Sequence, residues 1–230
     1  MSEPQDPSTP GAVASIPSLP VRIVQVFTSP GTLFERLKER PVWLGVLLLL
    51  VAVGAVANLL LPEEALRTIV EQNMPPGSDP SQVDDMVGIS RTWGMVFAVV
   101  GTPVSAALVA GLLILAYNVV LGGEASFRQL FSATVHSYVI LTVGGLITLG
   151  LLIAGGTQIV MSPALLLPDL GDGYPARFVE RINIFAIWTS VVLGIAISRI
   201  YPGRSAGGAI AYLLVLYMVL IALVSIPGGA

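Results

Sequence analysis

Five apolar segments, each long enough to cross a lipid bilayer, constrain the fold of this 230-residue chain more than any other feature. They are residues 42–61, 93–121, 135–155, 182–201 and 206–226. The hydrocarbon core of a bilayer is about 30 Å thick, and roughly 20 apolar residues of helix are needed to span it. Because lipid offers the backbone no hydrogen-bonding partner, each segment must be a helix. The sequence therefore predicts an all-α fold, a polytopic helical membrane bundle with five transmembrane helices.

The composition also indicates a membrane protein. Hydrophobic residues make up 54% of the chain and charged residues 11%, and the mean hydropathy is +0.85. In soluble domains about a quarter of the residues are charged. The net charge of -3 is too small to favour a nucleic-acid partner. With no cysteine and a single histidine, His136, the chain lacks the residues for disulfides, thiolate chemistry or a multi-histidine metal site, and we expect no cofactor.

The charged residues between the predicted spans indicate the orientation of the chain. With the N-terminus inside, seven basic residues fall on the cytoplasmic side and four on the outer side, and the outer loops hold nine of the fourteen acidic residues. The cytoplasmic set is Arg22, Arg36, Lys38, Arg40, Arg128, Arg199 and Arg204, and the outer set is Arg67, Arg91, Arg177 and Arg181. Membrane proteins concentrate basic residues on the cytoplasmic side. We therefore expect a multi-pass protein of a bacterial cytoplasmic membrane, with its N-terminus inside and its C-terminus outside.

Three regions are expected along the chain. Residues 1–20 hold five prolines and no basic residue, which predicts a disordered cytoplasmic tail and no cleaved signal peptide. Residues 21–41 are predicted as a juxtamembrane amphipathic helix, and residues 42–230 as the five-span membrane domain. In the long first outer loop, residues 62–92, start and stop signals predict two short helices, the second capped by Asp79.

The juxtamembrane prediction comes from the stretch "FTSPGTLFERLKERPVW", residues 27–43. Ser29 is placed to cap a helix that begins at Pro30, and Pro41 ends it. This helix has an apolar face and an opposite basic face, formed by Arg36, Lys38 and Arg40. The basic face is expected to lie against anionic lipid headgroups. The alternative is an ordinary basic flank of the first span that is also helical, and both interpretations give the same topology.

Polar residues gather at the predicted cytoplasmic ends of the second and third spans. Ser126 and Gln129 match a capping box, so the third helix is expected to begin near Phe127. A candidate polar cavity is formed by Asn118, Gln129, Ser132 and His136, with His136 as its titrating member. The alternative is that these groups satisfy one another or bind water, as polar residues at the ends of spans commonly do.

Small residues recur at every fourth position of the fourth span, at Ala186, Ser190, Gly194 and Ser198. In lipid, such a helix-packing ridge allows two helix backbones to approach closely. The ridge is expected either to pack within the bundle or to form a homodimer contact. In the second span, the sequence Gly101-Thr102-Pro103 predicts a kink.

The spans lack the side chains that ion-coupled transport and membrane catalysis commonly use. None contains Asp, Glu or Lys, and the chain has no serine-hydrolase or zinc-protease motif. We therefore expect no catalytic residue and a non-enzymatic role. The leading hypothesis is a scaffold or membrane-organising protein that contacts membrane lipids, a second copy of itself or another membrane protein. The alternative is a permease or channel-like transporter that uses the polar cavity.

Three stretches of the sequence resemble motifs of a known family. They are "FTSPGTLFERL" (27–37), "LGGEASFRQLFSATVHSY" (121–138) and "NIFAIWTSVVLGIAIS" (183–198). With five spans and a long first outer loop, they resemble the prokaryotic branch of the Yip family, the Ypt/Rab-interacting membrane proteins, over most of residues 21–226. The resemblance implies a five-span bundle with a cytoplasmic N-terminus and no enzymatic activity. Eukaryotic members bind prenylated Rab GTPases in vesicle traffic, but their Asp-Leu-Tyr and Tyr-Gly signatures are absent here, so we do not transfer that role.

Overall fold

The protein is described by a computed structural model that covers residues 15–75, 77–154, 162–167, 171 and 173–226. All regular secondary structure in these residues is helical, as the sequence predicts. Most of the predicted disordered tail, residues 1–20, lies outside the described residues.

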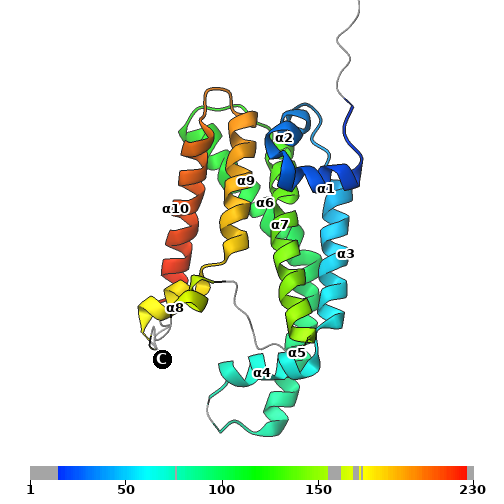
Figure 1. Ribbon diagram of the computed structural model, residues 1–230, viewed down its shortest axis with the longest axis vertical. Helices are drawn as coiled ribbons and strands as arrows, with labels where there is room; N and C mark the ends of the chain where they lie inside the picture. The colour runs from blue at the N-terminus through cyan, green and yellow to red at the C-terminus, as the bar shows by residue number, and fades with distance from the viewer. Residues whose placement is uncertain (1–14, 76, 155–161, 168–170, 172, 227–230) are drawn as a thin grey trace, which may run out of the picture.

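The helices follow one another along the chain as follows (Figure 1). They are α1 (Leu19–Thr28), α2 (Pro30–Glu39), α3 (Leu44–Leu60), α4 (Glu63–Asn73), α5 (Pro80–Val96), the π turn η1 (Phe97–Gly101), α6 (Thr102–Ile114), the π turn η2 (Leu115–Val120), α7 (Phe127–Ile153), the 3₁₀ turn η3 (Pro163–Leu166), α8 (Tyr174–Arg181), α9 (Ile184–Ile200) and α10 (Ala206–Val224).

The long helices run side by side along the bundle, and the short ones lie at its two ends (Figure 1). We call these the α1–α2 end and the α4–α8 end. Three helices are long and apolar enough to cross a membrane alone: Pro80–Val120, α7 and α10. The number rises to five if α3 with α4, bent by 86°, and α8 with α9, bent by 57°, each form one span. Helix α1 and the last turn of α10 lie at opposite ends (Figure 1).

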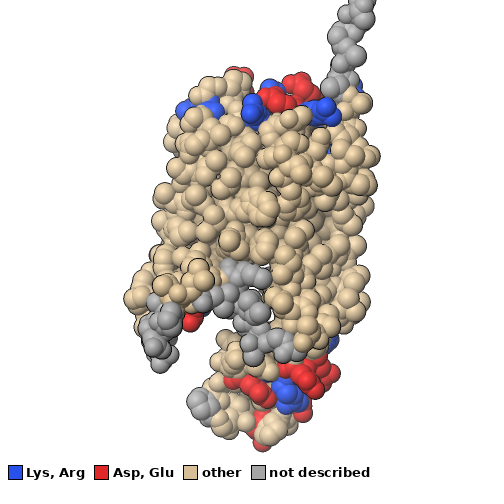
Figure 2. Space-filling view, in the orientation of Figure 1, with Lys and Arg blue, Asp and Glu red and all other residues tan. Residues whose placement is uncertain are grey.

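Charged side chains concentrate at the two ends of the bundle. On the face drawn in Figure 2, a broad band without Lys, Arg, Asp or Glu separates the two charged ends. This band covers the middle of the long helices, where the exposed side chains are apolar, such as Leu108 on α6 and Val215 on α10. An apolar band between two charged ends is the surface that a membrane-spanning bundle presents.

The second span differs from the prediction at its outer end. The short helix expected after Asp79 does not stop before the membrane, because α5, η1, α6 and η2 join into one helix of 41 residues, Pro80–Val120. At 1.5 Å per residue it is about 60 Å long, so it extends well beyond a bilayer. Arg91 is the last charged residue of this helix. It marks where the lipid-exposed part can begin, but the helix continues through it. At the position of the expected kink the structure has the π turn η1, which directly precedes Thr102 and Pro103, within one continuous helix.

The juxtamembrane region holds two helices where one was expected. Helix α2 begins at Pro30 as predicted, but the Ser29 side chain makes no capping bond. Ser29 takes an extended φ of -154°, because a residue before proline is disfavoured in the α conformation. The break separates α2 from α1, which the sequence analysis did not predict. The apolar face of α2, including Leu33 and Phe34, is buried in the main core of the bundle.

Helix α7 is the central helix of the α1–α2 end and packs against α3, α6 and α9. It starts at Phe127, and the predicted capping box between Ser126 and Gln129 is formed. The eight residues from Leu130 to Ser137 are all buried. The hydroxyls among them hydrogen-bond to carbonyls; Thr134, for example, donates to the Leu130 oxygen at 2.9 Å. The polar residues of this segment therefore lie in the packed interior.

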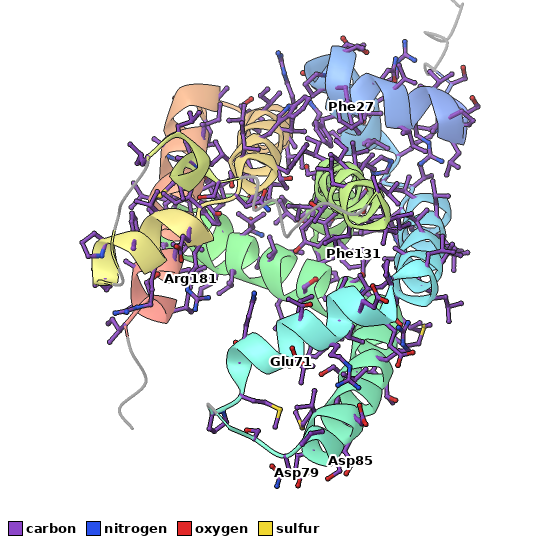
Figure 3. All side chains as sticks on the ribbon, turned by 60° about the horizontal axis from the view of Figure 1, so that its bottom comes forward. Phe27, Glu71, Asp79, Asp85, Phe131 and Arg181 are labelled. Carbon is purple, nitrogen blue, oxygen red and sulfur yellow. The ribbon has the colours of Figure 1, made fainter. Side chains whose placement is uncertain are left out.

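Helices α4 and α5 form a hairpin that projects from the opposite end and carries Glu71, Asp79 and Asp85 (Figure 3). The hairpin has a small apolar core of its own, formed by Leu66, Val70, Val83 and Val87. Asp79 caps α5 as predicted, by accepting a bond from the Ser81 amide at 2.8 Å.

Candidate functional site

The centre of the α1–α2 end is a contact between an arginine and the single histidine. Arg22, on α1, is 8% exposed, and its Nη1 lies 3.2 Å from Nε2 of His136, on α7. The Nδ1 atom of His136 lies 2.8 Å from the Ser132 carbonyl oxygen. Because a carbonyl oxygen only accepts, Nδ1 carries the proton and Nε2 accepts from the guanidinium. The geometry therefore requires a neutral imidazole that binds a cation.

Two further predicted residues join α7 to the end of α2 and to the segment that follows it. Ser132 Oγ donates to the Val42 carbonyl oxygen at 3.1 Å, and Arg22 Nη1 reaches the same oxygen at 3.4 Å. Gln129 Nε2 donates to the Lys38 carbonyl oxygen at 2.8 Å. These bonds satisfy carbonyls near the end of one helix and before the start of the next. Ser132 and His136 therefore form one network with Arg22 through the Val42 carbonyl, and Gln129 makes a separate bond to the end of α2.

Asn118, the fourth predicted cavity residue, belongs to a different cluster. It accepts from the Tyr201 hydroxyl at 2.6 Å and donates to the Ala125 carbonyl oxygen at 2.8 Å. The Tyr201 ring stacks on Tyr117, with the ring centroids 5.1 Å apart. This cluster ties η2 to the end of α9. A pocket of about 440 Å³ lies beside it and is lined by Gln129 and Tyr201, among others. Asn118 is not among the residues that line it, so the four predicted residues do not share one cavity.

Arg22 belongs to the site, although from the sequence it was predicted only to be one of the basic residues on the cytoplasmic side. No carboxylate pairs with it among the described residues. Its Nε atom is buried without a hydrogen-bond partner, and burial lowers the pKa of its guanidinium. One signal could have pointed to it: Arg22 and Gln25 are the only polar residues in 19–27, and their spacing places them on one helix face. That face points into the protein.

The predicted ridge on α9 contacts α10 at its centre. A Cβ atom added at Gly194 would lie 2.5 Å from Cγ1 and 2.8 Å from the amide nitrogen of Ile210. The hydroxyls of Ser190 and Ser198 donate to carbonyls of their own helix, at 2.9 and 2.7 Å. Gly194 is buried, and the other three ridge residues are half-buried. At Gly194 the ridge therefore allows close packing within one chain.

The predicted basic face of α2 has mixed surroundings. Lys38 pairs with Glu35 at 3.3 Å, and Glu35 also pairs with Arg199 on α9 at 3.5 Å. Arg36 is half-buried, whereas Arg40 is exposed. In the part of the chain that is described, no cluster of three His, Cys, Asp or Glu could hold a metal ion.

These features define the chain as a polytopic helical membrane protein with its buried polar groups concentrated at the α1–α2 end. Residues 24–226 match the Yip1 domain, so the chain belongs to the Yip1 domain family. It is similar to the membrane protein YknW of Bacillus subtilis (strain 168), with 29% identity over 182 residues, 76% of each chain. No solved structure matches the chain.

Proposed function

We propose that this Yip-domain protein is non-enzymatic and acts in the membrane through contacts with lipids, a second copy of itself or another membrane protein. The proposal rests mainly on the hydrogen bonds that the polar residues at the α1–α2 end make to other segments of the chain. Asn118, Gln129, Ser132 and His136 each bond to another segment of the chain. Such bonds hold the helices together, as interhelical bonds between polar residues do in membrane bundles.

The exposed surface supports the same proposal. Large apolar side chains face outward along the long helices; Val119, at the end of the second span, is 70% exposed. A lipid-facing bundle leaves such side chains in contact with acyl chains or with the apolar face of a partner. The α1–α2 end holds seven of the basic residues, and by the positive-inside rule this distribution supports a cytoplasmic location for that end.

Photo-crosslinking in native membranes tests the contacts. A photoreactive amino acid at Val119 should form adducts with lipid or with protein, which mass spectrometry of the purified adducts identifies. The matched control is Val135, which is fully buried in α7 and should give no intermolecular adduct. Equal labelling from the two positions would contradict the packing on which the proposal depends.

Proteoliposomes separate this function from the transport alternative. The purified protein should not increase the flux of protons, small ions or small polar solutes over empty vesicles. Solute-specific flux that Gln129→Ala abolishes, while the variant stays folded, would establish a permease and refute the proposal.

Reporter fusions test the orientation. A reporter that is active only in the cytosol should work when fused before Met1 and fail when fused after Ala230. Activity at both ends would require an even number of crossings and would overturn the five-span topology.

A further inference from the structure

Arg22 places an unpaired positive charge in the interior of the α1–α2 end. Its two bonded neighbours, the Val42 carbonyl and the His136 imidazole, are both neutral. Its Nε has no partner, and no carboxylate of the described residues lies within ion-pair distance. A buried charge without a counter-charge is strongly destabilising. The site therefore has the electrostatics of an anion receptor.

The N-terminus of α3 lies next to this charge. Nη2 of Arg22 is 3.9 Å from the position that a Cβ atom of Gly45 would occupy, in the first turn of α3. No side chain caps this helix. The amides of a first helical turn lack acceptors within the helix, and they carry the positive end of its dipole. Both Leu44 and Gly45 are exposed, so this turn of α3 lies at the surface of the bundle.

Helix α1, which supplies Arg22, is apolar on its outer face. Val21 and Val24 are 46% and 57% exposed, whereas the Arg22 and Gln25 side chains turn inward. In Figure 1, α1 lies across the end of α3. A ligand at Arg22 would therefore meet a cationic group and helix amides on one side and hydrocarbon side chains beside them. A phospholipid combines these properties, with an anionic phosphate next to acyl chains.

We propose that Arg22 and the first-turn amides of α3 bind a phosphate group, supplied by a phospholipid headgroup. The guanidinium donates charge-assisted hydrogen bonds to the phosphate oxygens, and the α3 amides complete the site. Gly45 places no side chain of its own in front of these amides, and the nearest neighbouring atom there is Leu19 Cδ1, 3.0 Å from the position of an added Cβ. The proposal rests on the proposed function only in placing this end of the bundle at a lipid surface.

Native mass spectrometry of the full chain, stripped of lipid in neutral detergent, tests the proposal. The probes are dihexanoyl phosphatidic acid, dihexanoylglycerol, which lacks the phosphate, and inorganic phosphate. Saturable binding of phosphatidic acid and no binding of dihexanoylglycerol are expected. Competition by inorganic phosphate at similar concentrations would identify the free anion as the source, with the same receptor chemistry. Equal binding of the two lipids would overturn the proposal, whatever the variants do.

Variants then locate the site. Arg22→Gln should weaken phosphatidic acid binding about tenfold or more, the effect of losing charge-assisted bonds. Arg40→Gln, which removes an exposed charge at the same end, is the matched control and should leave the affinity within about twofold. Gly45→Val keeps the charge but obstructs the amides, and it decides the question if Arg22→Gln does not fold. Wild-type affinity in both site variants would overturn the assignment, and crosslinking from Val119 would still report on the proposed function separately.

Discussion

Replacing Gly194 by alanine should destabilise the bundle through contact with the α10 backbone. The added Cβ would lie 2.5 Å from Ile210 Cγ1, 2.8 Å from its nitrogen and 2.9 Å from its Cα. Non-bonded carbon atoms pack at about 3.5–4.0 Å, so α10 must move away by a substantial part of an ångström. Overpacking of this kind costs roughly 1–3 kcal/mol, and the upper part of that range applies because two of the contacted atoms belong to the backbone.

Gly145→Ala is the matched control, because Gly145 also lies inside a long helix but has nothing within 4 Å of an added Cβ. Both substitutions gain about 1 kcal/mol of helix propensity, so the difference between the two variants isolates the contact with α10. Reversible unfolding in detergent measures the free energy of unfolding of each variant. The loss should not depend on protein concentration, since the contact lies within one chain. Equal stabilities, within about 0.5 kcal/mol, would refute the close α9–α10 packing.

Two predictions concern the α4–α8 end. Arg91 donates to the carbonyl oxygens of Asn58, in the last turn of α3, and of Leu61, just after it, both at 3.1 Å. Arg91→Ala should therefore cost about 1–3 kcal/mol and speed hydrogen exchange at the α3–α4 bend. Arg67→Ala, which breaks exposed ion pairs, should cost under about 1 kcal/mol, and a larger loss than for Arg91→Ala would contradict this ranking. Bonds from Ser81 hold the pKa of Asp79 below its usual 3.8. This cap therefore stabilises α5 fully above that value and is lost as the pH falls through the lowered pKa, so pepsin should cut the hairpin faster there. Asp79→Asn, which cannot titrate, should reduce that pH dependence relative to the unmodified protein, and an unchanged dependence would count against the cap.

Short sequence patterns correctly predicted the N-terminal caps of α5 and α7, because the hydrogen bonds of a cap join residues within one helical turn. The capping box at Ser126 and Gln129 fixed the start of α7, because both bonds lie within one helical turn. The Asp79 cap is a similar case. The extension of α5 into the second span was missed because charge marks the boundary of lipid and not the end of a helix. Arg91 ends the charged segment, yet the helix continues through it.

The inward position of Arg22 and the grouping of the polar residues depend on tertiary contacts, which the sequence pattern does not reveal. From the sequence, Arg22 was counted only as one of the basic residues on the cytoplasmic side, and only its packing against His136 shows that it turns inward. The four polar residues were grouped by their position along two neighbouring spans. Their separation into two clusters depends on Tyr201, which reaches Asn118 from the end of α9. Partners so far apart in sequence leave no periodic signal.

The α4–α5 hairpin is a suitable place to insert a tag or a label. Its tip, where the Ser78 amide donates to the Pro75 carbonyl, joins two helices that hold each other through their own four apolar side chains. An epitope tag or a fluorophore inserted at the tip should therefore leave the spans untouched. Antibody access to such a tag on intact cells would report surface delivery of the protein without detergent.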